Sequence, residues 1–166
     1  MRQRTEKGKC RILEPDPECA AGATDAQRPK EASQMNARVV KSDAEWRAQL
    51  TPLQYNVTRK KGTERSFSGE YLDCPEMGVF HCVCCGAPLF DSASKFDSGS
   101  GWPSFQAPID RQNIRTQEDC SWLIRRTEVL CAACDAHLGH VLDDGASSAG
   151  TRYCINSAAL RLEKER

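Results

Sequence analysis

Four cysteines in two Cys-x-x-Cys pairs constrain the fold of this chain more than any other feature of its sequence. The first pair is Cys82 and Cys85, and the second is Cys131 and Cys134. Because two intervening residues let a tight turn aim both sulfur atoms at one ion, two such turns supply the four thiolates of a closed tetrahedral zinc site. Cys85 and Cys131 are 46 positions apart, so the ion would join distant parts of the fold. The sequence therefore predicts one structural zinc ion per chain.

Other uses of the same cysteines are open at this point. Cys131, Cys134, His137 and His140 form a Cys-x2-Cys-x2-His-x2-His series that could ligate an ion alone. That series leaves the first pair unused, and its histidine spacing is shorter than the common three to five residues. Two redox motifs are a further alternative, but neither pair opens a predicted helix as a thioredoxin-like site does. The four-cysteine zinc site is the interpretation we favour.

The cellular compartment bears on this choice because the chain carries ten cysteines. Residues 1–10 are polar and charged, without the apolar segment of a secretory signal. Without export, cysteines more often bind metal or perform redox chemistry than form a disulfide framework. We therefore expect a cytoplasmic protein, although targeting to an organelle stays open.

Composition argues against two classes of partner. Lys and Arg number 23, and Asp and Glu number 23, so the net charge is zero. Binding to nucleic acid through bulk charge needs a basic excess or stripe. The longest unbroken apolar run is Val129–Cys134, six residues, whereas a membrane-spanning helix needs about 20. We expect neither nucleic acid nor a membrane as a partner.

The chain divides into a tail, residues 1–36, and a domain, residues 37–166. The tail holds no Phe, Trp, Tyr or Val, so it cannot bury enough apolar area to offset the entropy of ordering it. The domain is expected to open with a helix, because Ser42 and Glu45 have the spacing of a capping box and Pro52 limits the helix beyond them.

Short β-like stretches separated by turn residues follow from Thr63 onward. The clearest strands are residues 123–130 and 153–155, and glycines mark the turns between such stretches. The sequence therefore predicts a small, mainly β domain with mostly antiparallel strands behind a short helical segment.

A further cysteine, Cys154, lies on one of these predicted strands. Alternation along the strand places Arg152, Cys154 and Asn156 on one face, while Tyr153 and Ile155 point to the core. A nearby guanidinium favours the thiolate, which is the nucleophilic form of cysteine. A strand cysteine is also often a small buried residue without a reactive role, and the residues alone leave both interpretations open.

The loop of residues 99–105 (GSGWPSF) is the second unusual segment. Pro103 restricts Trp102 to extended backbone, and the neighbouring glycines let the chain turn tightly. A tryptophan held in this way can form the wall of a site for an apolar group. It can equally cover the edge of the core.

Taken together, these residues resemble the B-type methionine-R-sulfoxide reductases. With both cysteine pairs in order, the resemblance covers about residues 42–162. It is carried by five further motifs: Gly62-Thr63-Glu64, Phe67-Ser68-Gly69, residues 95–105 (KFDSGSGWPSF), His137-Leu138-Gly139-His140-Val141 and Arg152-Tyr153-Cys154-Ile155-Asn156-Ser157.

The resemblance implies a role for each candidate site residue. Cys154 would attack the sulfoxide sulfur as a thiolate and become a sulfenic acid. His140 would supply the proton, while His137 and Asn156 would orient the substrate and its developing charge. Trp102 would pack against the ε-methyl group, so that one sulfoxide epimer is selected.

The resemblance also implies the fold, the cofactor and the partners. It implies two small antiparallel sheets in a β-tent-like arrangement with short N-terminal helices, and a structural zinc distant from the chemistry. Members act on methionine-R-sulfoxide, mainly within oxidised proteins, and are usually recycled by thioredoxin or a similar thiol reductant. We expect this chain to act as a monomer.

The sequence departs from the family pattern at Ser100, where many members carry the cysteine that resolves the sulfenic acid into a disulfide. Cys74 is the replacement we expect, because Pro75 favours an exposed loop around it. Cys10 and Cys19 in the tail, and direct attack by an external thiol, remain alternatives.

Two other functions remain to be weighed. A non-catalytic zinc-ribbon binding module would have no need of Cys154. A zinc hydrolase would need an open coordination position rather than four thiolates.

Overall fold

The structure is a computed structural model that describes residues 38–119, 126–143 and 150–165. The predicted tail, residues 1–36, lies outside the described residues, as does the first part of the strand predicted at residues 123–130. Within the described ranges no helix is long and apolar enough to cross a membrane.

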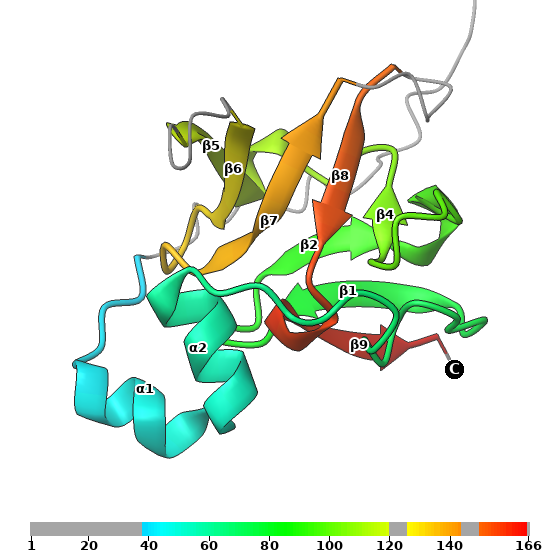
Figure 1. The fold of residues 1–166 in the computed structure, drawn as a ribbon. Helices are drawn as coiled ribbons and strands as arrows, with labels where there is room; N and C mark the ends of the chain where they lie inside the picture. The colour runs from blue at the N-terminus through cyan, green and yellow to red at the C-terminus, as the bar shows by residue number, and fades with distance from the viewer. Residues whose placement is uncertain (1–37, 120–125, 144–149, 166) are drawn as a thin grey trace, which may run out of the picture. The chain divides into compact units, whose positions relative to one another are not determined.

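Two short helices precede the sheets (Figure 1). Helix α1 (Asp43–Gln49) begins with the predicted capping box, in which Ser42 and Glu45 satisfy each other's backbone N–H groups. Pro52 follows the end of α1, as expected, but it also opens a second helix, α2 (Pro52–Lys60). Proline is favoured in the first helical turn because its missing N–H has no helical partner there. The local pattern predicts one helix here, the family resemblance implies several short helices, and the structure has two.

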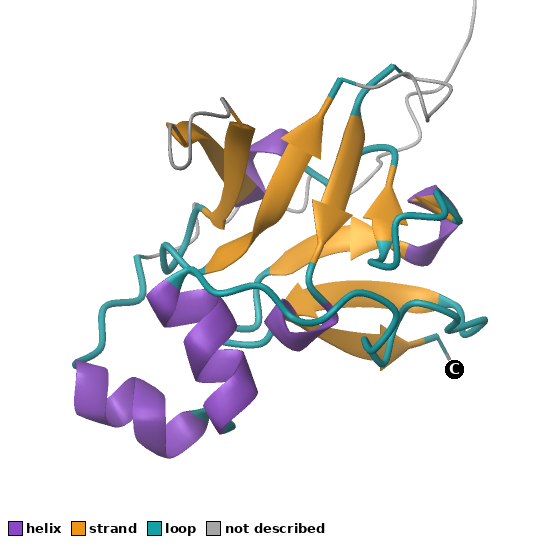
Figure 2. Ribbon diagram, in the orientation of Figure 1, coloured by secondary structure: helices purple, strands orange, loops and turns teal. Residues whose placement is uncertain are grey.

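Two antiparallel sheets form the rest of the domain, which confirms the predicted fold class (Figure 2). The smaller sheet has the order β2-β1-β9 and the larger has the order β3-β4-β8-β7-β6-β5. The strands of the smaller sheet are β1 (Gly78–Cys82), β2 (Pro88–Asp91) and β9 (Leu160–Lys164). Those of the larger sheet are β3 (Lys95–Phe96), β4 (Ser104–Phe105), β5 (Ile114–Asp119), β6 (Arg126–Cys131), β7 (His137–Leu142) and β8 (Arg152–Ile155).

An aromatic cluster packs the two sheets together. Phe80 of β1, Phe90 of β2 and Phe105 of β4 are each fully buried. The ring centroids of Phe80 and Phe105 lie 5.2 Å apart, and those of Phe90 and Phe105 lie 4.5 Å apart. Burying a phenylalanine stabilises a fold by about 1.5–3 kcal/mol, so this cluster is a main connection between the sheets.

Strand β8 shows the alternation that the sequence predicts. Ile155 is fully buried, and Tyr153 is half-buried with its ring 5.8 Å from that of Phe90. Cys154 therefore faces away from this core, on the other side of the larger sheet.

Candidate active site and metal centre

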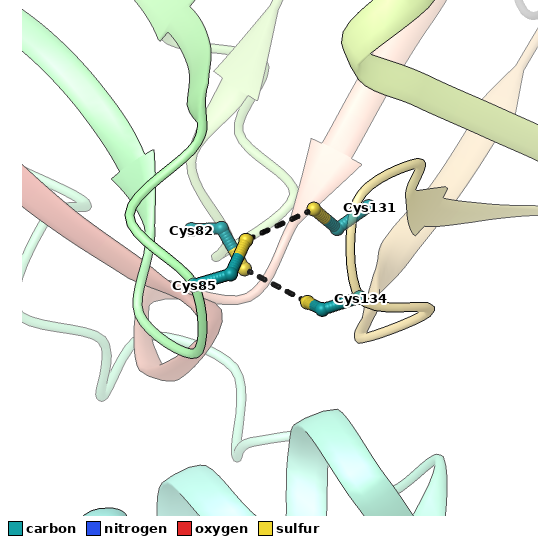
Figure 3. Close-up of side chains that lie close together, drawn as sticks. All are labelled: Cys82, Cys85, Cys131 and Cys134. Atoms are coloured by element: carbon teal, nitrogen blue, oxygen red, sulfur yellow. Dashed lines mark hydrogen bonds between the residues drawn. The ribbon is translucent and has the colours of Figure 1, made fainter. Parts of the chain in front are cut away.

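The four cysteines of the two pairs meet at one point (Figure 3). Their sulfur atoms all lie within 4.8 Å of one another. The Sγ atoms of Cys82 and Cys134 are 3.7 Å apart, and those of Cys85 and Cys131 are 3.6 Å apart. A zinc–sulfur bond of about 2.3 Å places neighbouring sulfurs of a tetrahedron about 3.8 Å apart. The four thiols therefore have the arrangement that one tetrahedral metal ion requires.

Two turns of matching geometry present these thiols. In the first turn the backbone carbonyl of Cys82 accepts a hydrogen bond from Gly86 N–H. In the second turn the carbonyl of Cys131 accepts one from Asp135 N–H. Gly86 and Asp135 occupy equivalent places and both have left-handed backbone, with φ of 78° and 56°. Glycine adopts this conformation freely, and aspartate tolerates it better than most residues. We call these turns, residues 82–87 and 131–136, the two knuckles.

The helices brace both knuckles. Gln49 of α1 donates a hydrogen bond to the carbonyl of Cys84 at 2.7 Å, and Arg59 of α2 donates one to the carbonyl of Cys134 at 2.9 Å. Asp135 in the second knuckle also pairs with Arg38 and Arg115. The helical segment therefore supports the cysteine cluster.

The alternative ligand series, which uses histidines, is not the arrangement that the structure favours. Among the described residues, the potential metal-binding cluster consists of cysteines alone. His137 Nδ1 instead lies 2.8 Å from a carboxylate oxygen of Glu128. Both histidines are thus left for other chemistry.

A row of polar residues crosses the larger sheet on one face. Residues directly paired in neighbouring antiparallel strands point to the same face. The pairing register places five side chains in such a line across β4, β8, β7, β6 and β5, and we call it the polar row: Ser104, Cys154, His140, Glu128 and Gln117.

A cavity of about 270 Å³ opens at Cys154 and His140 of this row. Four of the candidate site residues line it together: Cys154, His140, Asn156 and Trp102. Cys74 and His137 are not among its lining residues. The full lining is Thr63, Trp102, Arg126, Gly139, His140, Leu142, Cys154, Ile155 and Asn156.

One hydroxyl group lies beside the thiol of Cys154, and hydrogen bonds link it to two further serines. The Ser100 hydroxyl lies 4.0 Å from Cys154 Sγ, so the position that departs from the family pattern is in contact with this thiol. Ser98 donates to Ser100 at 2.9 Å and shares a hydrogen bond of 2.7 Å with Ser104. Arg152, which is buried, donates to Ser98 at 3.5 Å.

Glu64 holds two of the candidate residues through its backbone. Its carbonyl accepts a hydrogen bond from Trp102 Nε1 at 3.1 Å, and its N–H donates to Asn156 Oδ1 at 3.1 Å. Asn156 Nδ2 in turn donates to the carbonyl of Leu138 at 3.0 Å. These contacts fix the tryptophan ring and the amide in place, and they commit most of the Asn156 amide to the backbone.

The histidines differ in their surroundings. His137 is buried and lies against Glu128, and burial lowers the pKa of His137. His140 is more exposed, and its Nε2 lies 3.5 Å from Asp119 Oδ2. The ring centroids of the two histidines are 5.4 Å apart. A neutral imidazole and an imidazole beside a carboxylate are suited to different steps of proton transfer.

Glu64, Glu128 and Lys61 take part in the site, although no local pattern in the sequence gives them a role. Glu64 belongs to a quoted motif, but its contacts with Trp102 and Asn156 are long-range and leave no pattern in the sequence. Glu128 and Lys61 likewise meet only after folding.

The predicted resolving residue, Cys74, lies in the segment before β1, with its thiol 3.9 Å from a carboxylate oxygen of Glu76.

Comparison with known proteins gives a consistent result. The family model described as the SelR domain matches residues 50–164. A protein of Hahella chejuensis named peptide methionine sulfoxide reductase MsrB is 62% identical over 125 residues, which are 75% of this chain and 90% of that protein. A protein of the same name from Chromohalobacter salexigens is 55% identical over 127 residues, 76% of this chain and 96% of that protein.

A plant protein matches over the same share of this chain. The rice protein named peptide methionine sulfoxide reductase B1, chloroplastic, is 58% identical over 124 residues, 74% of this chain. The matched region is 58% of the length of the rice protein.

Proposed function

This chain belongs to the SelR-domain family of B-type peptide methionine sulfoxide reductases, and from this premise we propose that it reduces methionine-R-sulfoxide, mainly within oxidised proteins, to methionine. The observation that carries the proposal is the shared cavity. It brings a cysteine, a histidine, an amide and a tryptophan from separate parts of the chain to one place.

The chemical step uses Cys154 as the nucleophile. Its thiolate attacks the sulfoxide sulfur, and the sulfoxide oxygen is transferred to the cysteine with uptake of one proton. Methionine leaves as the thioether, reduced by two electrons, and Cys154 becomes a sulfenic acid, oxidised by two electrons. Arg152 stands two residues before Cys154 on β8, and a guanidinium on the same strand face supports the thiolate form.

The other residues of the cavity assist this step. His140 supplies the proton that the departing oxygen needs, and its Nε2 lies 3.5 Å from a carboxylate oxygen of Asp119. Trp102 receives the ε-methyl group, and His137 and Asn156 help to orient the substrate. The carbonyl of Glu64 holds the ring of Trp102 in one orientation, so the apolar wall of the cavity has a fixed position. A fixed wall for the methyl group supports selection of one sulfoxide epimer.

An assay with both sulfoxide epimers tests this proposal. We expect the chain to reduce dabsyl-methionine-R-sulfoxide and to leave the S epimer, and we expect Cys154→Ser to fold normally without activity. His140→Asn should slow the single-turnover rate by about 10²–10⁴-fold. Preference for the S epimer, or a single-turnover rate of Cys154→Ser within tenfold of wild type, would contradict the proposal.

Regeneration of Cys154 needs two electrons from thiols, supplied by thioredoxin or another thiol reductant. Cys74 remains our candidate resolving cysteine, with direct attack by the external thiol as the alternative. Cys10 and Cys19 lie outside the described residues. Ser100 cannot form a disulfide, although its hydroxyl lies 4.0 Å from the Cys154 sulfur.

Thiol counting after one equivalent of substrate separates these routes. If Cys74 resolves the sulfenic acid, wild type should lose two thiols per turnover and Cys74→Ser should lose only one. Equal losses in the two proteins would eliminate Cys74. The variant Ser100→Cys provides a positive control, because it places a second thiol next to Cys154.

The metal is zinc in a structural role, in our proposal. Four thiolates close the coordination sphere, so no position is left for substrate. None of the four cysteines lines the cavity. When bound, zinc would join the end of β1 to the turn between β6 and β7, which belong to different sheets. Metal analysis of the purified protein should find one zinc per chain.

We propose a monomer that acts in the cytoplasm, while the match to a chloroplastic plant protein keeps an organelle open as the compartment. The zinc-ribbon alternative is less favoured, because a binding module has no use for the cavity around Cys154. Light scattering tests the monomeric state, and subcellular fractionation tests the compartment.

A further inference from the structure

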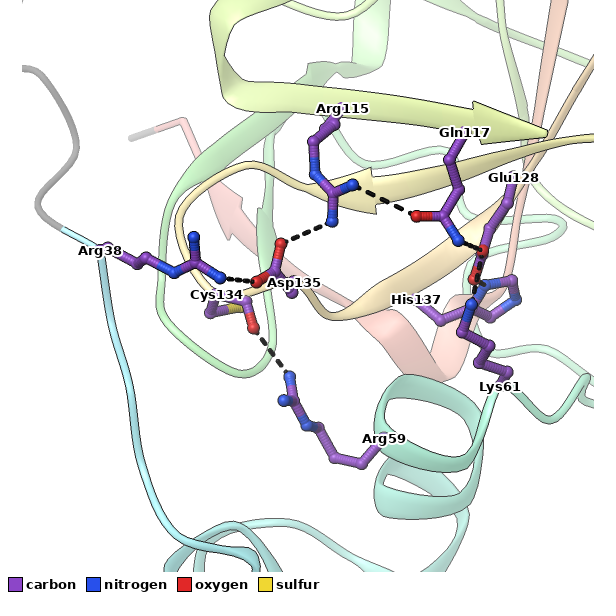
Figure 4. Close-up of polar contacts among 9 residues, drawn as sticks. All are labelled: Arg38, Arg59, Lys61, Arg115, Gln117, Glu128, Cys134, Asp135 and His137. Carbon is purple, nitrogen blue, oxygen red and sulfur yellow. Dashed lines mark hydrogen bonds and ion pairs between the residues drawn. The ribbon is translucent and has the colours of Figure 1, made fainter. Parts of the chain in front are cut away.

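A buried carboxylate lies beside the histidines (Figure 4). Glu128 is on β6 within the larger sheet, and its side chain is 2% exposed. Burying a carboxylate is costly unless its oxygen atoms accept hydrogen bonds from well-placed donors. Two groups contact Oε2, Lys61 Nζ at 2.8 Å and Gln117 Nε2 at 2.9 Å, while His137 Nδ1 lies 2.8 Å from Oε1.

These contacts determine where the protons lie. A lysine ammonium and an amide nitrogen can only donate, so Oε2 accepts both bonds. Burial alone would raise the pKa of Glu128, but hydrogen bonds from Lys61 and His137 outweigh it and lower the pKa. Glu128 is therefore ionised at neutral pH. An ionised carboxylate can only accept, so His137 donates from Nδ1.

His137 itself stays neutral. Burial lowers the pKa of His137, and the nearby Lys61 and His140 add to the effect, while Glu128 opposes it. With one ring proton, placed on Nδ1, the Nε2 atom carries a lone pair. That atom is buried and has no hydrogen-bond partner among the described residues.

Lys61 is the decisive group in this arrangement. Without it, the buried negative charge of Glu128 would attract a second proton to His137, since an uncompensated buried charge is strongly unfavourable. Two imidazolium rings with centroids 5.4 Å apart would repel each other, so a proton on His137 would disfavour one on His140. His140 lines the cavity and also faces Asp119 from β5, whereas His137 does not line it.

We propose that Lys61 and Glu128 are positioning residues that hold His137 as the neutral Nδ1–H tautomer, which leaves proton donation at the cavity to His140. This inference rests on the proposed function for the use of that proton. Gln117, the last residue of the polar row, supports the same carboxylate oxygen as Lys61. The two histidines then have distinct roles, because His140 gives a proton to the sulfoxide oxygen, whereas His137 keeps its Nδ1 proton in the hydrogen bond to Glu128.

Nitrogen NMR of the zinc-loaded full chain, labelled with ¹⁵N-histidine, tests the inference without reference to activity. Wild type at neutral pH should show His137 protonated on Nδ1 and bare on Nε2. In Lys61→Met both nitrogens of His137 should be protonated at the same pH. Lys60→Met, which removes the neighbouring lysine near the Tyr55 ring, is the matched control, and Lys61→Arg should restore the wild-type pattern.

Steady-state kinetics on a small sulfoxide substrate gives a second readout. We expect kcat of Lys61→Met to fall on the acidic side by about tenfold for each pH unit below the raised pKa of His137, with KM little changed. Lys60→Met should follow the wild-type profile. A wild-type His137 protonated on Nε2, or a Lys61→Met spectrum and pH profile equal to those of wild type, would overturn the inference. Failure of the chain to reduce any sulfoxide would overturn the proposed function instead, and the NMR result would still decide the protonation states.

Discussion

Replacing Glu64 with glutamine tests whether its buried carboxylate stabilises the chain that follows the cavity residue Asn156. Glu64 is 4% exposed, and its two oxygen atoms accept hydrogen bonds from the N–H groups of Ser157 at 2.7 Å and Ala158 at 2.9 Å. These N–H groups open the short helix η4 (Ser157–Ala159), directly after Asn156. In Glu64→Gln one oxygen becomes an NH₂ group, which cannot accept and instead faces a backbone donor.

The expected loss follows from these contacts. A hydrogen bond to a charged group contributes about 1.5–3 kcal/mol, and a buried N–H left without a partner costs about 1–3 kcal/mol. Allowing for local relaxation, we expect unfolding free energy to fall by about 3 kcal/mol. For a domain of this size, such a loss lowers the melting temperature by about 10 °C.

Thermal unfolding followed by circular dichroism, with zinc in excess, measures the effect. Glu70→Gln is the matched control, because Glu70 is an exposed glutamate of the neighbouring segment, and its melting temperature should not change. A Glu64→Gln melting temperature within about 2 °C of wild type would refute the argument. We also expect reduced turnover, since Glu64 contacts Trp102 and Asn156 through its backbone.

Three further predictions follow from the cluster, the sheet and the buried histidine. Cys82→Ser should release the metal and lower the melting temperature, because metal binding contributes directly to folding; full zinc content by metal analysis would contradict this. Gly139→Ala should reduce both stability and turnover, because a Cβ there would overlap the carbonyl oxygen of Cys154 on the paired strand; unchanged melting and kinetics would show that β7 and β8 can separate freely. Since burial lowers the pKa of His137, below pH 6.5 the unfolded chain binds a proton that the folded chain does not, so stability should fall as the pH drops from 6.5 toward the lower folded pKa. Melting temperatures of zinc-saturated wild type and His137→Gln, measured at several pH values, check this. An equal change of melting temperature with pH in the two proteins would count against it.

The sequence predicted the local features of the fold well. The capping box at Ser42, the alternation around Cys154 and the thiol-bearing turns depend on residues that are close together in the chain, so their patterns are visible before folding. Pro52 predicts the end of α1, but a proline also favours the first turn of a helix, and the local pattern misses this start of α2. Its capping residues, Thr51 and Gln54, carry the same spacing as the first capping box.

The supporting residues of the site could not be predicted in the same way. Glu64 and Ser157 are far apart in sequence, and Lys61 reaches Glu128 from the end of another element. Such contacts depend on tertiary packing, which no local period encodes. Glu128 stands in the sequence between Thr127 and Val129 with Arg126 close by, so nothing local indicates that its carboxylate is buried and paired with Lys61.

The two knuckles have a consequence for the order in which the protein assembles. Each knuckle closes within its own hairpin, between β1 and β2 or between β6 and β7, through hydrogen bonds that need no metal. Each hairpin can therefore present two thiols early, whereas the proposed zinc ion can be bound by all four thiols only once the two sheets have met. Chelation of the native protein should accordingly first loosen the contact between the sheets, while the hairpins persist. After chelation, the rate of backbone amide hydrogen exchange should therefore rise first where the two sheets face each other and only later within the knuckles.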